Sequence, residues 1–152
     1  KFIVRPFTRN NVDAAIFLLA EAAAQAANGT AAAPAASTSS AAPAAAPGGY
    51  SEAAVAAYHN VINTYFKTQN TWSTASDPYT ALLNIATQLG FSKETFDATL
   101  KDSKAVAPLE AARDQAMHEF GLTGTPTFYI NGKALSGEKT LDALSAEIDP
   151  LL

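Results

Sequence analysis

Apolar residues recur every three or four positions along most of the chain after residue 50, and this spacing predicts helices with one buried face. The first of these helices is expected from Ser51, a plausible N-cap residue, to about Gln69. Its expected inner face consists of Val55, Tyr58, Ile62, Tyr65 and Phe66. Trp72 follows in the sequence, and we expect it in a short turn packed against that face.

Three more helices are predicted between residues 77 and 120. Asp77 and Pro78 form an N-cap followed by a first-turn proline, and the stripe that follows ends at Gly90. Ser92 is expected to cap a shorter helix. The third helix is expected to start near Ala105 to Ala107, because Pro108 has no N–H to donate and fits best in a first turn. The expected inner residues of the three helices are Leu82, Ile85, Ala86 and Leu89; Phe96 and Leu100; and Leu109, Ala112, Ala116, Met117 and Phe120.

The beginning of the chain has a different pattern. Lys1 to Phe7 is rich in Phe, Ile and Val without helical spacing, which predicts a buried strand. A helix capped by Asn10, Asn11 or Asp13 is expected after it. Residues 22–49 contain only Ala, Gln, Asn, Gly, Thr, Pro and Ser. Such side chains cannot offset the entropy lost on ordering the backbone, so 22–49 is predicted to be a disordered insertion, helical only at its start.

A hairpin is predicted near the end of the chain. A β-branched and aromatic strand at Thr127–Ile130 is followed by Asn131-Gly132, the strongest short signal for a type I′ turn. A second strand is expected around Lys133 to Leu135, and then a helix from Thr140 to about Asp149. If the Thr125–Pro126 bond is cis, the backbone of Thr125 is left unpaired and directed outward. Thr125 and Pro126 are therefore candidate residues for binding an extended peptide.

Composition limits the chemistry that the chain can perform. The net charge is −4 and the basic residues are scattered, which argues against nucleic-acid binding. No apolar run approaches the ~20 residues of a membrane span. His59 and His118 have no neighbouring His or Cys at metal-ligand spacing, so no metal or other cofactor is expected. No catalytic triad or carboxylate pair is indicated, and the chain contains no cysteine.

Several of these segments resemble DsbA-like thiol–disulfide oxidoreductases of the thioredoxin superfamily. The resemblance is carried by Gly121-Leu-Thr-Gly-Thr-Pro-Thr-Phe-Tyr-Ile-Asn-Gly-Lys133, by Lys1-Phe-Ile-Val-Arg-Pro-Phe7, and by Trp72 and Asp77-Pro78. It implies an α/β, thioredoxin-like fold with an inserted helical subdomain. The expected division is a strand and turn at 1–13, an inserted helical region at 14–120, and a ββα unit with the Pro126 loop at 121–152.

The family's Cys-x-x-Cys motif would fall upstream of Lys1. We therefore expect a domain truncated at its N-terminus, without its first strand and redox helix. In the family that strand lies between the strands that correspond to Lys1–Phe7 and Thr127–Ile130. Its absence would leave two unpaired sheet edges, so the isolated chain is expected to be marginally stable and prone to aggregation.

The function implied by the resemblance is that of a fragment of a protein disulfide oxidoreductase. Its partners would be reduced or misfolded proteins and a redox partner, in the bacterial periplasm or cell envelope. The chain itself has no catalytic residue, and Thr125 and Pro126 are its expected substrate-binding residues. Two alternatives remain: a relative of the kappa-type glutathione transferases and isomerases, which use a serine, and a redox-inactive peptide-binding domain.

Overall fold

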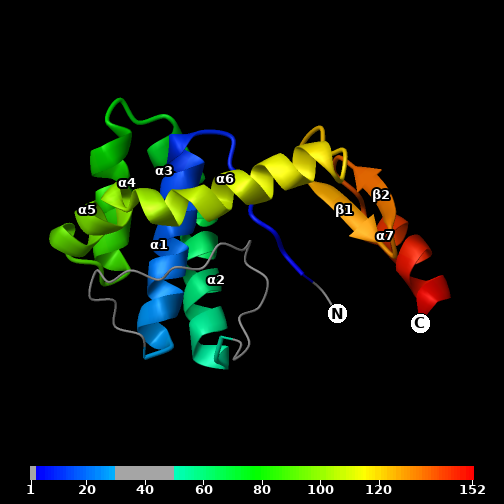
Figure 1. Ribbon diagram of the computed structural model, residues 1–152, viewed down its shortest axis with the longest axis horizontal. Helices are drawn as coiled ribbons and strands as arrows, with labels where there is room; N and C mark the ends of the chain where they lie inside the picture. The colour runs from blue at the N-terminus through cyan, green and yellow to red at the C-terminus, as the bar shows by residue number, and fades with distance from the viewer. Residues whose placement is uncertain (1–2, 30–49) are drawn as a thin grey trace. The chain divides into compact units, whose positions relative to one another are not determined.

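The computed structural model describes residues 3–29 and 50–152, and these form two compact units divided within a helix. The first unit ends at Ala112 and the second comprises Arg113–Leu152. Figure 1 shows the helices and strands of each unit. The described elements are α1 (Asn11–Ala27), α2 (Glu52–Lys67), α3 (Gln69–Ser73), α4 (Pro78–Gln88), α5 (Lys93–Lys101), α6 (Ser103–His118), β1 (Thr127–Ile130), β2 (Lys133–Ser136), α7 (Leu141–Ile148) and the 3₁₀ turn η1 (Asp149–Leu151).

The helix starts follow from their capping residues. Asn10 Oδ1 accepts hydrogen bonds from the N–H groups of Val12 and Asp13, both at 2.9 Å. Ser51, Asp77 and Ser92 cap α2, α4 and α5 in the same way, as predicted. Each cap satisfies an N–H group that has no acceptor within the helix, so these boundaries are determined by short-range chemistry.

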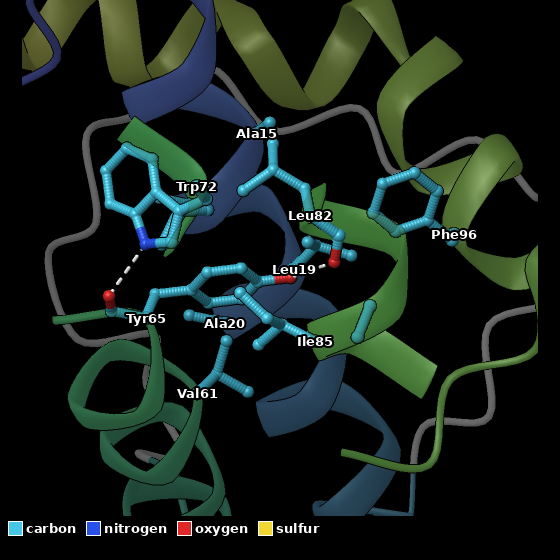
Figure 2. Packing of buried hydrophobic residues seen from close by; sticks show 11 residues of the cluster. Ala15, Leu19, Ala20, Val61, Tyr65, Trp72, Leu82, Ile85 and Phe96 are labelled. Carbon is cyan, nitrogen blue, oxygen red and sulfur yellow. Dashed lines mark hydrogen bonds between the residues drawn. The ribbon is translucent and has the colours of Figure 1, made fainter. Parts of the chain in front are cut away.

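The first unit is held together by a core formed between α1, α2, α3, α4 and α5 (Figure 2). Tyr65 is central to it, because its hydroxyl donates to the Leu82 carbonyl at 2.9 Å while its own carbonyl accepts from Trp72 Nε1 at 2.8 Å. The expected packing of Trp72 against α2 is confirmed. The core consists of Ala15, Ile16, Leu19, Ala20, Val61, Tyr65, Trp72, Leu82, Ile85, Ala86 and Phe96.

Helix α1 continues through residues 22–27 and ends at Ala27, so the prediction that the 22–49 segment is helical at its start is confirmed. Most of these residues are alanine, which has the highest helix propensity of the amino acids. Ala24 is also fully buried, and its small side chain suits close packing. The rest of the predicted insertion, residues 30–49, lies outside the described residues.

The inner faces of α2 and α6 were predicted too broadly. Val55, Phe66, Met117 and Phe120 are exposed, whereas Tyr65 is 1% exposed. Successive residues in a helix differ by about 100° in direction, so Tyr65 and Phe66 cannot both face one neighbouring layer. Phe66 is 63% exposed as a result.

Helix α6 begins earlier than predicted, at Ser103 rather than near Ala105 to Ala107, and Pro108 lies inside it. Asp102 explains the early start. Its Oδ1 accepts from Lys104 N at 3.0 Å and from Ala105 N at 3.4 Å, which supplies an N-terminal cap upstream of the proline.

The predicted strand at Lys1–Phe7 is wrong for the residues that the structure describes. Residues 3–7 have no regular secondary structure, and Ile3 and Val4 are 65% and 62% exposed. A strand requires a partner strand for its backbone groups, and the strands of the described residues, β1 and β2, pair only with each other. Apolar composition alone is insufficient to form one.

The second unit contains an antiparallel hairpin of β1 and β2, drawn as two adjacent arrows in Figure 1. Asn131 and Gly132 have φ values of 47° and 85°, which are the positive values that a type I′ turn requires. Thr140 caps α7 through Ala143 N at 3.2 Å. The predicted hairpin and closing helix are thus confirmed. Every residue from 113 to 152 is at least partly exposed to solvent, so this unit has no closed core.

Candidate functional site

The loop before β1 is the part of the second unit that the sequence singled out. It runs from Gly121, with φ of 64°, to Pro126, and the Thr125–Pro126 peptide bond is cis. Thr127 Oγ1 donates to the Gly124 carbonyl at 2.6 Å, and Gly137 N donates to the Pro126 carbonyl at 2.8 Å. The residues on both sides of Thr125 are therefore anchored to the hairpin.

Thr125 itself remains accessible. It is exposed, and within residues 113–152 neither its N–H nor its carbonyl has a hydrogen-bond partner. A backbone donor and acceptor beside an anchored loop can pair with an extended chain. The two predicted site residues, Thr125 and Pro126, thus form a polar backbone surface rather than a set of reactive side chains.

The free surface continues along β1. Ile130 pairs with Lys133 next to the turn, and Phe128 pairs with Leu135 two residues further on. In an antiparallel pair, residues that exchange hydrogen bonds alternate with residues that do not. The Gly137–Pro126 bond continues the same two-residue step. The backbone groups of Thr127 and Tyr129 are therefore directed away from β2, toward the open edge of the hairpin.

The contribution of the Thr127 and Tyr129 backbone was not predicted from the sequence. The sequence did contain the necessary signal. A two-residue type I′ turn fixes which flanking residues are hydrogen-bonded to each other, and the alternation of hydrogen-bonded and non-hydrogen-bonded pairs along the strand follows from that first pair. Tyr129 also anchors the loop: its hydroxyl donates to the Phe120 carbonyl at 2.8 Å, and the two rings lie 6.0 Å apart.

The site has no charged side chain of its own. Residues 121–132 contain no Asp, Glu, Lys, Arg or His. The nearest charge in sequence, Lys133, forms an ion pair with Glu147 at 2.5 Å. Recognition at this edge would therefore depend on backbone hydrogen bonds and apolar contact, not on charge.

A polar cluster on the first unit was also not predicted from the sequence. Lys93 Nζ lies 2.6 Å from Asp97 Oδ2 and 3.0 Å from the Tyr79 hydroxyl, which donates to Asp97 Oδ1 at 2.5 Å. The hydrogen bond from Lys93 lowers the pKa of Asp97. All three groups are accessible to solvent, and the cluster connects α4 to α5. The cluster could not be predicted from the sequence, because Tyr79 lies on a different helix from Lys93 and Asp97.

The remaining candidates do not form a site. His59 is exposed beside Tyr58, with ring centroids 5.7 Å apart. Residues 3–29 and 50–152 contain no group of His, Cys, Asp and Glu that could hold a metal ion. A hollow of about 210 Å³ near the start of α1 includes Arg9, Asp13 and Trp72, but Arg9 and Asp13 are paired with each other at 3.1 Å. No helix of the described part is long and apolar enough to cross a membrane.

Comparison with known proteins supports one family. A family model described as thioredoxin matches residues 1–150, which is nearly the whole chain. Searches of curated proteins and of solved structures found no match. The hairpin with its preceding proline loop, the helical region and this match agree, and the chain belongs to the thioredoxin family.

Proposed function

We propose that this chain is the substrate-binding part of a DsbA-like protein thiol–disulfide oxidoreductase. The observation that carries the proposal is the exposed Thr125 backbone, unpartnered within its unit, in a loop whose neighbours are anchored to β1 and β2. The thioredoxin family match and the Gly-Thr-Pro-Thr-Phe sequence support it. Thr125 would pair through its N–H and carbonyl with an extended segment of a substrate protein.

The thiol chemistry requires residues outside these 152, because the chain has no cysteine. In the proposed parent, a thiolate at a helix N-terminus is stabilised by the helix dipole. A substrate thiolate attacks the parent's disulfide and forms a mixed disulfide. A second substrate thiolate then releases the parent as a dithiol, so the substrate is oxidised and the parent reduced. The chain described here would hold the substrate during both steps.

The open edge of β1 is consistent with this proposal. Thr127 and Tyr129 present backbone groups that β2 does not use, as a strand in the interior of a larger sheet would. We infer that the parent's cysteine-bearing strand pairs there, and that its redox helix then lies near Thr125. The proposed parent acts on envelope proteins in the bacterial periplasm.

Peptide binding can be tested on the chain itself. The ¹⁵N-labelled protein is titrated with a capped, uncharged, extended decapeptide, and amide shifts are followed by NMR. We expect concentration-dependent shifts at Thr125, with little change at Ala134 on β2. Thr125→Pro removes the N–H and should abolish the shifts in the loop, whereas Thr123→Pro, the same change two residues earlier, should retain them. A peptide that leaves the Thr125 amide unmoved at millimolar concentration contradicts the proposal.

A redox-inactive peptide-binding domain is the second candidate, favoured by the absence of cysteine together with the accessible Thr125 backbone. The coding sequence upstream of Lys1 separates the two. A coding sequence for Cys-x-x-Cys at that position supports the oxidoreductase. A thioredoxin-like strand and helix without cysteine supports the binding domain, and a single serine in place of the motif supports a relative of the glutathione transferases.

A further inference from the structure

The chain contains two Asn-Gly pairs, Asn28-Gly29 and Asn131-Gly132, and the structure places them in different surroundings. In this dipeptide the asparagine side chain can react with the backbone nitrogen that follows it, because glycine has no side chain to hinder the approach. All four residues are exposed, and both glycines have positive φ. Exposure and glycine conformation therefore do not distinguish the two pairs.

Hydrogen bonds hold the reacting groups of the first pair. Gly29 N donates to the Ala26 carbonyl at 3.2 Å at the end of α1. Asn28 Oδ1 accepts from Ser51 N at 3.0 Å, which fixes the side chain toward the start of α2. The nitrogen and the carboxamide of this pair can meet only after both bonds have opened.

The second pair lacks this restraint. Within residues 113–152, neither the Gly132 N–H nor the Asn131 side chain has a hydrogen-bond partner. Asn131 also has φ of 47°, a region that is unfavourable for a residue with a Cβ, so leaving it costs little. The sheet of the described residues has only two strands, and such a hairpin opens easily at its tip.

We propose that Asn131 is a site of spontaneous deamidation, and that the isoaspartate formed there unpairs β1 from β2. The Gly132 nitrogen loses its proton to hydroxide and attacks Cγ of the Asn131 side chain. The carbon–nitrogen bond of the carboxamide breaks, ammonia leaves, and a succinimide ring closes. Water then opens the ring at either carbonyl and gives aspartate or isoaspartate. The net reaction consumes one water and releases one ammonia.

The two products differ in their effect on the turn. Aspartate keeps the two-residue loop, and Asp-Gly is itself a preferred type I′ sequence. Isoaspartate directs the backbone through the former side chain and adds one carbon to the loop. Loop length sets the register of a hairpin, so the added carbon disrupts the Ile130–Lys133 pair next to the turn. The same ladder ends at the Gly137–Pro126 bond, so its loss loosens the loop that carries Thr125.

Deamidation is measured on the 152-residue chain during incubation at mildly alkaline pH, by peptide mapping with mass spectrometry. Asn131 should be converted at least about tenfold faster than Asn28, because two hydrogen bonds must open before Asn28 can react. Asn131→Gln has a longer side chain that closes the ring far more slowly, and it should remove most of the conversion. The matched change Asn28→Gln should leave the conversion nearly unchanged.

Hydrogen exchange tests the effect on the hairpin. In the isoaspartate fraction, separated by chromatography, the amides of Phe128 and Leu135 should lose protection by at least about tenfold, whereas Asn131→Asp should retain it. Three results would overturn the proposal: Asn28 reacting as fast as Asn131, Asn131 still intact when a synthetic peptide of residues 128–133 is fully converted, or unchanged exchange in the isoaspartate fraction. The proposal does not depend on peptide binding at Thr125, since no measurement here involves a bound peptide.

Discussion

Tyr65 and Phe66 are adjacent aromatic residues of α2 that the structure places in opposite environments. Tyr65 is 1% exposed within the core, and Phe66 is 63% exposed. Replacing each with alanine removes an aromatic ring from the same helix and introduces the same residue. The pair therefore tests the packing of the first unit with the effect of helix propensity largely matched.

The expected magnitudes follow from burial and hydrogen bonding. Removing a buried aromatic ring costs about 3–5 kcal/mol, because the transfer energy is lost and a cavity remains. Tyr65→Phe keeps the ring and removes only the hydroxyl that donates to the Leu82 carbonyl at 2.9 Å, so it should cost about 1 kcal/mol. Phe66→Ala at an exposed position should change stability by less than about 0.5 kcal/mol.

Trp72 provides the assay, since it is the only tryptophan of the chain and packs in the same core as Tyr65. Its fluorescence during urea denaturation reports the unfolding of the first unit alone. The free energy of unfolding should decrease in the order wild type and Phe66→Ala, then Tyr65→Phe, then Tyr65→Ala, with similar m-values. If Phe66→Ala costs as much as Tyr65→Ala, the assigned face of α2 is incorrect.

Three further outcomes are expected. Burial raises the pKa of Tyr58 to about 12, against about 10 in an unfolded chain. As the pH rises, the unfolded state therefore loses the Tyr58 proton before the folded state does. The free energy of unfolding should be constant below pH ~10 and fall between pH ~10 and ~12. Tyr58→Phe should make this fall shallower in urea titrations followed by circular dichroism, and identical slopes would count against the half-buried Tyr58 as its source. Replacing residues 30–49 by a short Gly/Ser linker should shift the free energy of unfolding of the first unit by less than about 1 kcal/mol. The reason is that Asn28 Oδ1 already accepts a hydrogen bond from Ser51 N at 3.0 Å and so joins the end of α1 to the start of α2. A large loss of stability, measured by Trp72 fluorescence, would show that the segment contributes to the core. Gly132 has φ of 85°, so Gly132→Ala should destabilise the hairpin by about 1–2 kcal/mol, as measured by hydrogen exchange of the amides that pair β1 with β2. Gly124 has no positive φ, and no atom lies near a Cβ added there, so Gly124→Ala should leave the stability unchanged.

The locally determined features could be predicted. Asn10, Ser51, Asp77 and Ser92 each begin a helix by accepting a hydrogen bond from an N–H two or three residues away. The turn at 131–132 depends on the positive φ of two adjacent residues. Interactions of this range are complete within a few residues of sequence, and for that reason the hairpin and the loop with Thr125 and Pro126 were found in advance.

The predictions of a strand and of buried helix faces failed because these features require a partner distant in sequence. Lys1–Phe7 has the composition of a strand, yet the described residues of this segment form none, because none of the strands in the described part of the chain pairs with it. The choice between Tyr65 and Phe66 depended on which side of α2 packs against α1 and reaches the Leu82 carbonyl of α4. The free edge at Thr127 and Tyr129 exists because nothing pairs with it within the described residues. Short-range hydrogen bonds are specified by neighbouring residues, whereas burial and strand pairing are properties of two segments at once, so they follow only from the packed chain.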